Sequence, residues 1–177
     1  MTAERYRTVY NWFNQRPRLR RAFTAAVKST PAVPVVLYGV LLVLRAADAV
    51  SLRSAGGEAF RASLVLLLRS ILVPFFTFVG GSLLRSRLNR PRPYEQPGFV
   101  PLVQKDTRGK SFPSRHALSA GVIAMAWLRT SIPVGLFLIL WAFWVCFTRV
   151  IGGMHSEKDV VCGAGLGFLA GAAGMFL

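Results

Sequence analysis

Acidic residues are scarce in this chain of 177 residues, which has 7 aspartates and glutamates against 22 lysines and arginines and a net charge of +15. Histidine and cysteine are scarcer still, with two of each. Cys146 and Cys162 show neither a CxxC spacing nor a nearby histidine pair, so we interpret them as small buried apolar residues. The sequence also lacks a soluble domain, a long-period repeat and a low-complexity linker.

Apolar residues, by contrast, make up 53% of the chain, and its mean hydropathy is +0.45. Three apolar runs, at about 32–50, 63–84 and 133–151, are long enough to cross a bilayer, which takes about 20 residues. Two more, at about 116–132 and 157–177, are shorter or rich in glycine. The runs are continuous rather than alternating, which excludes a porin-like barrel. We therefore predict an all-α, polytopic membrane helical bundle of about five transmembrane helices.

A basic arm, residues 1–31, precedes the transmembrane domain that we expect over 32–177. Apolar residues recur at helical spacing on both sides of Pro17, which predicts two short amphipathic helices in the membrane interface; a disordered basic tail is the alternative. We do not expect a cleaved signal peptide, because no apolar segment follows the charges before residue 32. The charges flank membrane segments without a nucleic-acid-binding pattern, so we expect no nucleic acid partner. The cations of the arm are Arg5, Arg7, Arg16, Arg18, Arg20, Arg21 and Lys28.

The last apolar run carries Gly163, Gly167 and Gly171 at four-residue spacing. Small residues on one stripe of a helix let two helix backbones approach closely in lipid. The stripe is therefore expected to pack against another span of the same chain, with a homodimer seam as the alternative.

The first of three polar clusters, at 85–93, holds four arginines and two prolines at the end of an apolar run. The prolines set an extended backbone, which fixes the direction of the Arg92 side chain. The guanidinium groups of Arg85 and Arg92 each present a rigid fork of donors that suits phosphate oxygens. Such a cluster is also compatible with an ordinary topogenic flank.

The second cluster, Ser111 to Gly121, enters an apolar helix through Pro113 and Ser114. Unpaired backbone N–H groups at a helix start attract anions, and the Ser114 hydroxyl adds a donor. His116 could give or take a proton there, although a single histidine at an interface is also compatible with no function.

The third cluster runs from Thr148 to Asp159 and includes Arg149. His155 follows a Gly-Gly turn, and Asp159 stands four residues later on the same helical face. A carboxylate bonded to one ring nitrogen makes the other more basic, as a nucleophilic or general-base histidine requires. The alternative is a capped helix start in which Asp159 acts only on the helix dipole.

Together, both histidines and most arginines outside the arm gather at three helix ends on one side of the membrane. The set contains two histidines and one carboxylate partner, but neither paired acids nor three metal-type ligands. It therefore fits phosphoryl transfer through a phosphohistidine, without a metal or another cofactor, with arginines neutralising the phosphate oxygens.

At these residues the sequence resembles the type 2 phosphatidic acid phosphatase family, which shares its site with the vanadium haloperoxidases. The matching motifs are Arg85-x6-Arg92-Pro93, Pro113-Ser114-Arg115-His116 and Thr148-Arg149-x5-His155-x3-Asp159. The resemblance implies that His155 is the nucleophile, Asp159 its orienting partner and His116 the general acid. It further implies that the phosphate is held by Arg85, Arg92, Ser114 and Arg149.

Three positions depart from the pattern of this family. Arg85 stands in place of lysine, Thr148 in place of serine, and Arg115 in place of the glycine before the acid histidine. The side chain of Arg115 adds charge at the rim of the phosphate site. This favours a substrate with a second phosphate or an acidic headgroup, although Arg115 could instead contact lipid phosphates non-specifically.

The resemblance implies a lipid phosphatase in a bacterial-type cell membrane, with undecaprenyl diphosphate as the leading substrate. Phosphatidylglycerol phosphate, phosphatidic acid and phosphorylated lipid A are the alternatives, and a vanadate-dependent oxidase or a non-catalytic lipid-binding protein would be a different class. The arginines and lysine of the arm place the site on the cytoplasmic side by the positive-inside rule. Many relatives with six spans place it outside, and we leave both orientations open.

Overall fold

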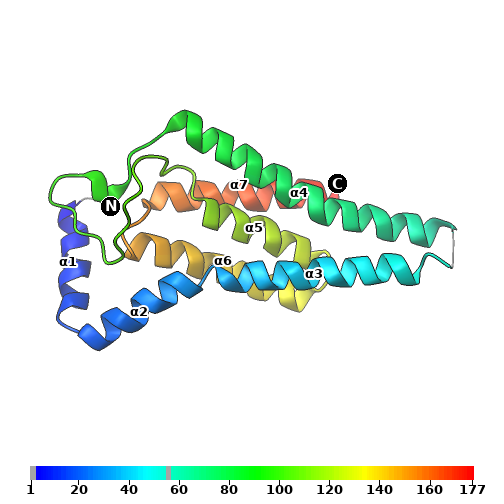
Figure 1. Cartoon of the computed structure of the whole chain (residues 1–177), viewed down its shortest axis with the longest axis horizontal. Helices are drawn as coiled ribbons and strands as arrows, with labels where there is room; N and C mark the ends of the chain where they lie inside the picture. Colours follow the sequence, from blue (N-terminus) through cyan, green and yellow to red (C-terminus); the bar gives the residue numbers. More distant parts are fainter. Residues whose placement is uncertain (1–2, 55–56) are drawn as a thin grey trace.

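The computed structural model describes residues 3–54 and 57–177, and in this part of the chain all regular structure is helical. Two short helices come first, followed by a hairpin of two long ones and three more that complete the bundle (Figure 1). A long loop with one short 3-10 turn separates the hairpin from the last three helices. The elements are α1 (Ala3–Asn14), α2 (Pro17–Ser29), α3 (Ala32–Ser51), α4 (Gly57–Leu88), η1 (Pro93–Glu95), α5 (Arg115–Leu128), α6 (Ile132–Ile151) and α7 (Glu157–Phe176).

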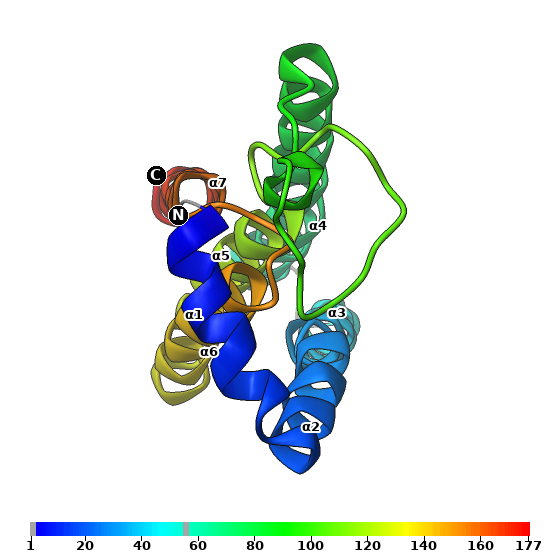
Figure 2. The same cartoon turned by 90° about the vertical axis from the view of Figure 1, so that its left-hand side faces the viewer.

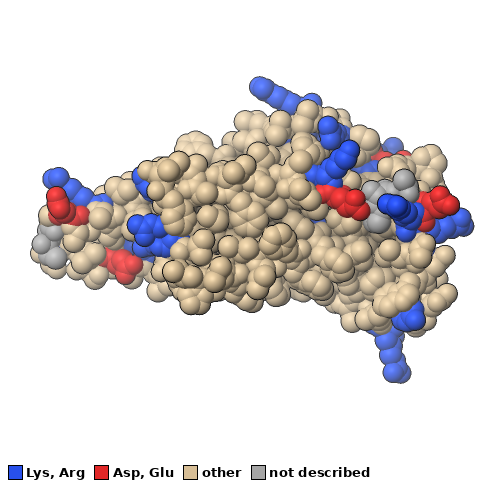
Figure 3. Space-filling view, turned by 180° about the vertical axis from the view of Figure 1, so that it is seen from behind, with Lys and Arg blue, Asp and Glu red and all other residues tan. Residues whose placement is uncertain are grey.

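Four segments of the described chain are long and apolar enough to cross a membrane: Pro17–Ser51, Gly57–Glu95, Ile132–Ile151 and Glu157–Phe176. Seen from the side, an almost uncharged belt separates the charged groups at the two ends of the molecule (Figure 3). The prediction of an all-α membrane helical bundle is therefore confirmed.

Helix α5 differs from the four long segments, because its 14 residues extend only about 21 Å at ~1.5 Å per residue. The hydrocarbon layer is about 30 Å thick. Helix α5 packs against α4, α6 and α7 and buries most of its side chains, so it is the central helix of the bundle. Its enclosure explains why the sequence at 116–132 is apolar although the helix is short.

The glycine stripe of α7 packs against α5 within the same chain. A Cβ atom at Gly163 would lie 2.6 Å from the backbone oxygen of Ser114, and one at Gly167 would collide with the backbone oxygen of Leu118. Gly171 faces the side chain of Met125 in the same way. The interpretation as an internal packing stripe is confirmed, and the homodimer seam through Gly163, Gly167 and Gly171 is wrong because α5 already covers it.

The two cysteines do not lie in the core. Cys146 is half-buried and Cys162 is exposed on the outer face of α7, so the expectation that both are buried was wrong. Both lie in segments that can span a membrane, where an outward-facing side chain meets lipid instead of water.

The basic arm packs against the same end of the bundle as the long loop 89–114 and the turn 152–156 (Figures 1 and 2). Helix α1 lies across this end, and Tyr6 and Phe13 are buried in an apolar cluster with Phe99 and Leu102 of the loop. Helix α2 instead runs on into α3 with a bend, and both fall within one apolar segment. All three polar clusters of the sequence thus meet at one end of the molecule.

Candidate active site

The pair His155–Asp159 lies where the chain turns from α6 into α7. Gly153, at φ +77, makes a turn that disfavours residues with a side chain, and His155 follows it just before the helix begins. Ser156 is the N-cap of α7. The backbone N–H of Asp159 donates to Ser156 Oγ, and the backbone N–H of Ser156 donates to Asp159 Oδ2 at 2.8 Å. Asp159 Oδ2 lies 3.7 Å from Nδ1 of His155, and both residues are 4% exposed. The capping box therefore fixes the carboxylate beside the imidazole ring.

Ser111 is a member of this site that sequence reasoning did not identify. Its Oγ donates to Asp159 Oδ2 at 2.6 Å and lies 3.4 Å from Nδ1 of His155. Burial lowers the pKa of His155, while the carboxylate of Asp159 acts in the opposite direction. Nδ1 of the ring faces Asp159 and Ser111, which leaves Nε2 as the nitrogen free to react. Ser111 stands at the start of the second cluster, but no spacing in the sequence connects it to Asp159.

Three buried arginines bring the expected phosphate-binding groups together. Arg85 donates to the carbonyl oxygen of Pro113 at 3.0 Å, and Arg92 Nε donates to that of Gly109 at 3.0 Å. Arg149 donates to the carbonyl oxygen of Val27 at 3.3 Å. The side chains are 4–7% exposed, and none of the three forms a salt bridge with a carboxylate of the described chain. Buried guanidinium groups whose partners are carbonyl oxygens, a thioether (Met154, for Arg149) and an aromatic ring (Tyr94, for Arg92) retain charge and N–H donors for an anion.

Unpaired donors mark the same region. Five buried side-chain atoms of the described residues have no hydrogen-bond partner, and three of them belong to this region: Nε of Arg149 and the hydroxyls of Ser114 and Ser82. The other two, Nε of Arg45 and the hydroxyl of Ser63, lie away from it. Ser114 is the N-cap of α5, and its backbone N–H donates to the carbonyl oxygen of Asp159 at 2.9 Å. Buried donors are normally satisfied, so this set is explained by a ligand rich in acceptors.

His116, at the first turn of α5, borders an apolar cavity of about 300 Å³. Phe78, Ile123 and Val145 line this cavity together with Arg115. Arg149 and His155 are among the groups near enough to act electrostatically on His116. His116 therefore lies between the cationic site and an apolar space suited to a lipid chain.

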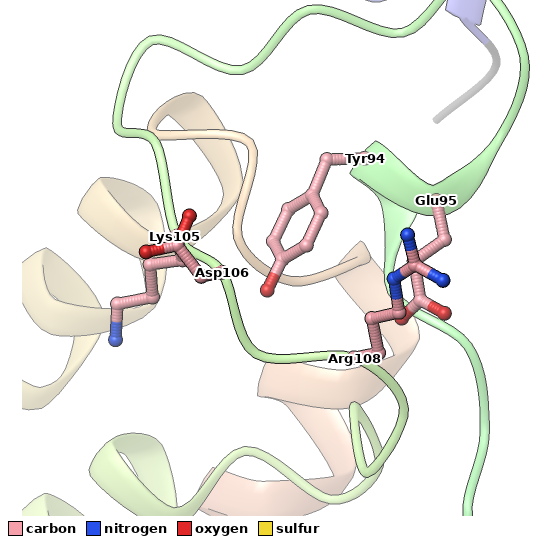
Figure 4. A pocket seen from close by; sticks show the side chains of 5 residues that line it. All are labelled: Tyr94, Glu95, Lys105, Asp106 and Arg108. Carbon is pink, nitrogen blue, oxygen red and sulfur yellow. The ribbon is translucent and has the colours of Figure 1, made fainter.

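Two polar cavities adjoin the arginines. The first, of about 440 Å³, is lined by Arg85, Arg92 and Arg115 among others, so three of the predicted phosphate ligands border it, whereas Ser114 and Arg149 do not. The second, of about 590 Å³, is bordered by Tyr94, with Lys105 and Asp106 on one side of the ring and Glu95 and Arg108 on the other (Figure 4).

Lys105 is a second residue that sequence reasoning missed. Partial desolvation, together with Arg149, Arg92, Arg85 and Arg115, lowers its pKa. A single lysine in a polar loop has no distinguishing pattern, so only the fold shows that it belongs with the arginines.

Tyr6 connects the arm to the turn 152–156, which carries His155. The sequence did not indicate this connection either. Its hydroxyl accepts from the N–H of Leu102 and donates to the carbonyl oxygen of Ile151, both at 2.9 Å. Burial raises the pKa of Tyr6 to about 12, so the hydroxyl keeps its proton. Gly153 faces this hydroxyl and leaves no room for a Cβ atom. The arm thus supports the turn that carries His155.

Substitution of Ser111 by alanine should lower kcat about tenfold and change KM by less than about twofold. The hydroxyl orients Asp159 and His155, and loss of a hydrogen bond to a charged group is typically worth ~1.5–3 kcal/mol. Steady-state kinetics would measure the effect, with Ser70→Ala as control, since Ser70 is buried in α4 and its hydroxyl donates to the carbonyl oxygen of Leu66 in the same helix. A larger effect on KM than on kcat would contradict an orienting role.

The described residues contain no group of three or more histidine, cysteine, aspartate or glutamate side chains arranged to hold a metal ion. The site is instead a cationic cavity with one carboxylate–histidine pair. All eight residues expected from the sequence lie at this end of the bundle: His155, His116, Asp159, Arg85, Arg92, Ser114, Arg115 and Arg149.

Comparison with known proteins identifies the family. Residues 60–176, more than half of the chain, match the family model of the PAP2 superfamily. The fold is similar to that of Aquifex aeolicus LpxE, with a TM-score of 0.67, 23% identity, and coverage of 99% of this chain and 95% of that one. It is also similar to a transmembrane PAP2-type phosphatidylglycerolphosphate phosphatase from Bacillus subtilis, with a TM-score of 0.52, 22% identity, and coverage of 96% and 93%. The chain belongs to the PAP2 superfamily, whose type 2 phosphatases its sequence motifs resemble.

Proposed function

We propose that this membrane lipid phosphatase releases phosphate from a lipid phosphomonoester or diphosphate through a phosphohistidine on His155. The observation that carries the proposal is the joint burial of Arg85, Arg92 and Arg149 without carboxylate partners, beside an imidazole oriented by Asp159. Burying three cations unpaired is unfavourable, and a phosphate dianion offsets this cost by accepting their free N–H groups.

The proposed reaction has two steps, formation and hydrolysis of the phosphohistidine. In the first, Nε2 of His155 attacks phosphorus while the bond to the leaving oxygen breaks. Burial and nearby cations lower the pKa of His116 to about 3, so the ring takes up a proton once the phosphate dianion lies beside it, and it gives this proton to the leaving oxygen. Asp159 keeps the proton on Nδ1 and stabilises the charge that develops on the ring. In the second, His116 takes a proton from water, the resulting oxygen attacks the phosphohistidine, and the nitrogen–phosphorus bond breaks to release phosphate.

We propose that the reaction needs no metal ion. The arginines, with the Ser114 hydroxyl and the N–H groups at the start of α5, supply the positive charge that a metal would otherwise bring to the phosphate oxygens. His155 supplies the nucleophile, so no metal-bound water is required.

Undecaprenyl diphosphate is the leading candidate substrate. The apolar cavity beside His116 suits the chain next to the leaving oxygen, and Arg115 adds charge between this cavity and the phosphate site. Phosphatidylglycerol phosphate is the alternative, as the name of the Bacillus subtilis structure suggests, and phosphatidic acid follows. We further propose a location in a bacterial-type plasma membrane, with residues 1–31 as an interfacial arm and 32–177 as the phosphatase domain.

A turnover assay with the purified protein in lipid vesicles tests these proposals. Undecaprenyl diphosphate, phosphatidylglycerol phosphate and phosphatidic acid would be compared at matched concentrations, with and without a chelator, and with added vanadate as a phosphate mimic. We expect turnover that survives chelation, is inhibited by vanadate and is fastest with undecaprenyl diphosphate. Loss of activity in chelator would refute the metal-independent mechanism, and binding without turnover of any lipid phosphate would favour a non-catalytic lipid-binding protein.

A further inference from the structure

The cavity that contains Arg85 and Arg92 is lined by three further cations, Arg108, Lys110 and Arg115. None of its lining residues is aspartate or glutamate. Only Arg85, Arg92 and Arg149 are needed to hold the reacting phosphate in the proposed mechanism. The additional charge in a cavity of about 440 Å³ therefore needs its own explanation.

The loop that carries Arg108 and Lys110 is attached directly to the phosphate site. The carbonyl oxygen of Gly109 accepts from Arg92 Nε at 3.0 Å, and its N–H donates to Glu95 Oε1 at 2.7 Å. The N–H of Lys110 donates to Asn89 Oδ1 at 3.2 Å. Lys110 has φ +51, a left-handed conformation that a lysine adopts only where its surroundings hold it. The backbone that carries the two cations is thus held in place beside Arg92.

The charge of these cations is largely uncompensated. Arg115 lies over the ring of Phe78, with its Cζ atom 5.6 Å from the ring centre, and neither Arg115 nor Lys110 forms a salt bridge in the described chain. Arg108 has Glu95 nearby in the adjoining cavity (Figure 4). The carboxylate of Glu95 already accepts from the backbone N–H groups of Arg92 and Gly109. Positive charges that outnumber the one nearby carboxylate favour an anion.

The position of Arg115 indicates where this anion would lie relative to the phosphate that reacts. It lines both the cationic cavity and the apolar cavity of His116, so it stands where the phosphate site meets the space for the lipid chain. In a lipid diphosphate, the phosphate that leaves with the lipid occupies this junction, between the attacked phosphorus and the chain. A lipid monophosphate has no group there to meet Arg115.

We infer that Arg108, Lys110 and Arg115 form a second anion subsite, and that the substrate carries a second anionic group next to the phosphate that is removed. This inference rests on the proposed function. It favours a lipid diphosphate, or a headgroup with a second phosphate, over phosphatidic acid, which carries only one.

Paired substrates with the same chain test the subsite. Farnesyl diphosphate and farnesyl monophosphate would be compared in the full-length protein and in Arg115→Gln, Lys110→Asn and the double variant. Asparagine is chosen at position 110 because it tolerates the left-handed backbone. We expect the ratio of kcat/KM for diphosphate over monophosphate to fall about tenfold in each single variant and further in the double variant.

Arg87→Gln is the matched control, because Arg87 is exposed near the end of α4 and does not line the cavity. It should leave the ratio unchanged. An equal loss for both substrates in the Arg115 and Lys110 variants, or the same shift in Arg87→Gln, would overturn the second subsite. If the unmodified protein hydrolyses neither substrate, nor any lipid of the vesicle assay, the proposed function itself fails, and the two failures are thereby distinguished.

Discussion

Replacement of His155 by alanine or asparagine is expected to lower phosphate release on the order of 10⁴-fold or more, to the background rate. In the proposed mechanism the residue forms the covalent bond to phosphorus, and removal of a nucleophile costs far more than removal of a binding contact. Rapid quenching after exposure to ³²P-labelled substrate should trap label on the unmodified protein in an acid-labile, base-stable bond, as expected of phosphohistidine. The variants should carry no such label.

The two variants of His155 serve as controls for each other. Alanine leaves a cavity beside Ser111 and Asp159, whereas asparagine keeps a polar group facing the carboxylate. Thermal unfolding of the asparagine variant should match that of the unmodified protein, so its inactivity is attributable to chemistry. Turnover that persists in a folded asparagine variant would refute the phosphohistidine mechanism.

Replacement of His116 by asparagine is expected to lower the rate of phosphoenzyme formation by about 10²–10⁴-fold on a lipid monophosphate, the usual contribution of a general acid. The alkoxide of a lipid alcohol is a poor leaving group and needs a proton, which His116 supplies in the proposed mechanism. A lipid diphosphate expels a phosphate instead, so its loss should be smaller. With p-nitrophenyl phosphate, whose leaving group needs no proton, labelling of His155 should persist.

The test is whether the loss of rate is largest for the lipid monophosphate, smaller for the lipid diphosphate and smallest for p-nitrophenyl phosphate. It would be measured by single-turnover kinetics, in which formation of the phosphoenzyme is observed before its hydrolysis. A uniform loss across all three substrates would mean that His116 only binds substrate or maintains the fold. His155→Asn provides the contrast, because it should abolish labelling with every leaving group.

Much of this protein could be predicted from its sequence because the constraints are local. Lipid requires every spanning segment to satisfy its own backbone, so continuous apolar runs predicted the helices and their number to within one short central helix. The spacing of His155 and Asp159 is likewise local, since residues four apart share a helical face. The glycine spacing in the last run predicted close packing for the same reason.

Contacts between residues far apart in the chain were decided only by the tertiary structure. Ser111 meets Asp159 across 48 residues, and Tyr6 meets the carbonyl oxygen of Ile151 across 145. No periodicity records such contacts, because each requires loops and the arm to fold back onto one end of the bundle. The same folding gathers Lys105, Arg108 and Lys110 around the predicted arginines.

By itself, the sequence determined an α-helical membrane protein and the residues of its three motifs, because helix geometry and the need to satisfy backbone groups in lipid act within short segments. Only the tertiary structure decided that α5 packs on the glycine stripe, that Ser111 bonds to Asp159 beside His155, and that further cations border the predicted phosphate site. These features depend on which surfaces meet, and that is set by packing of the whole bundle.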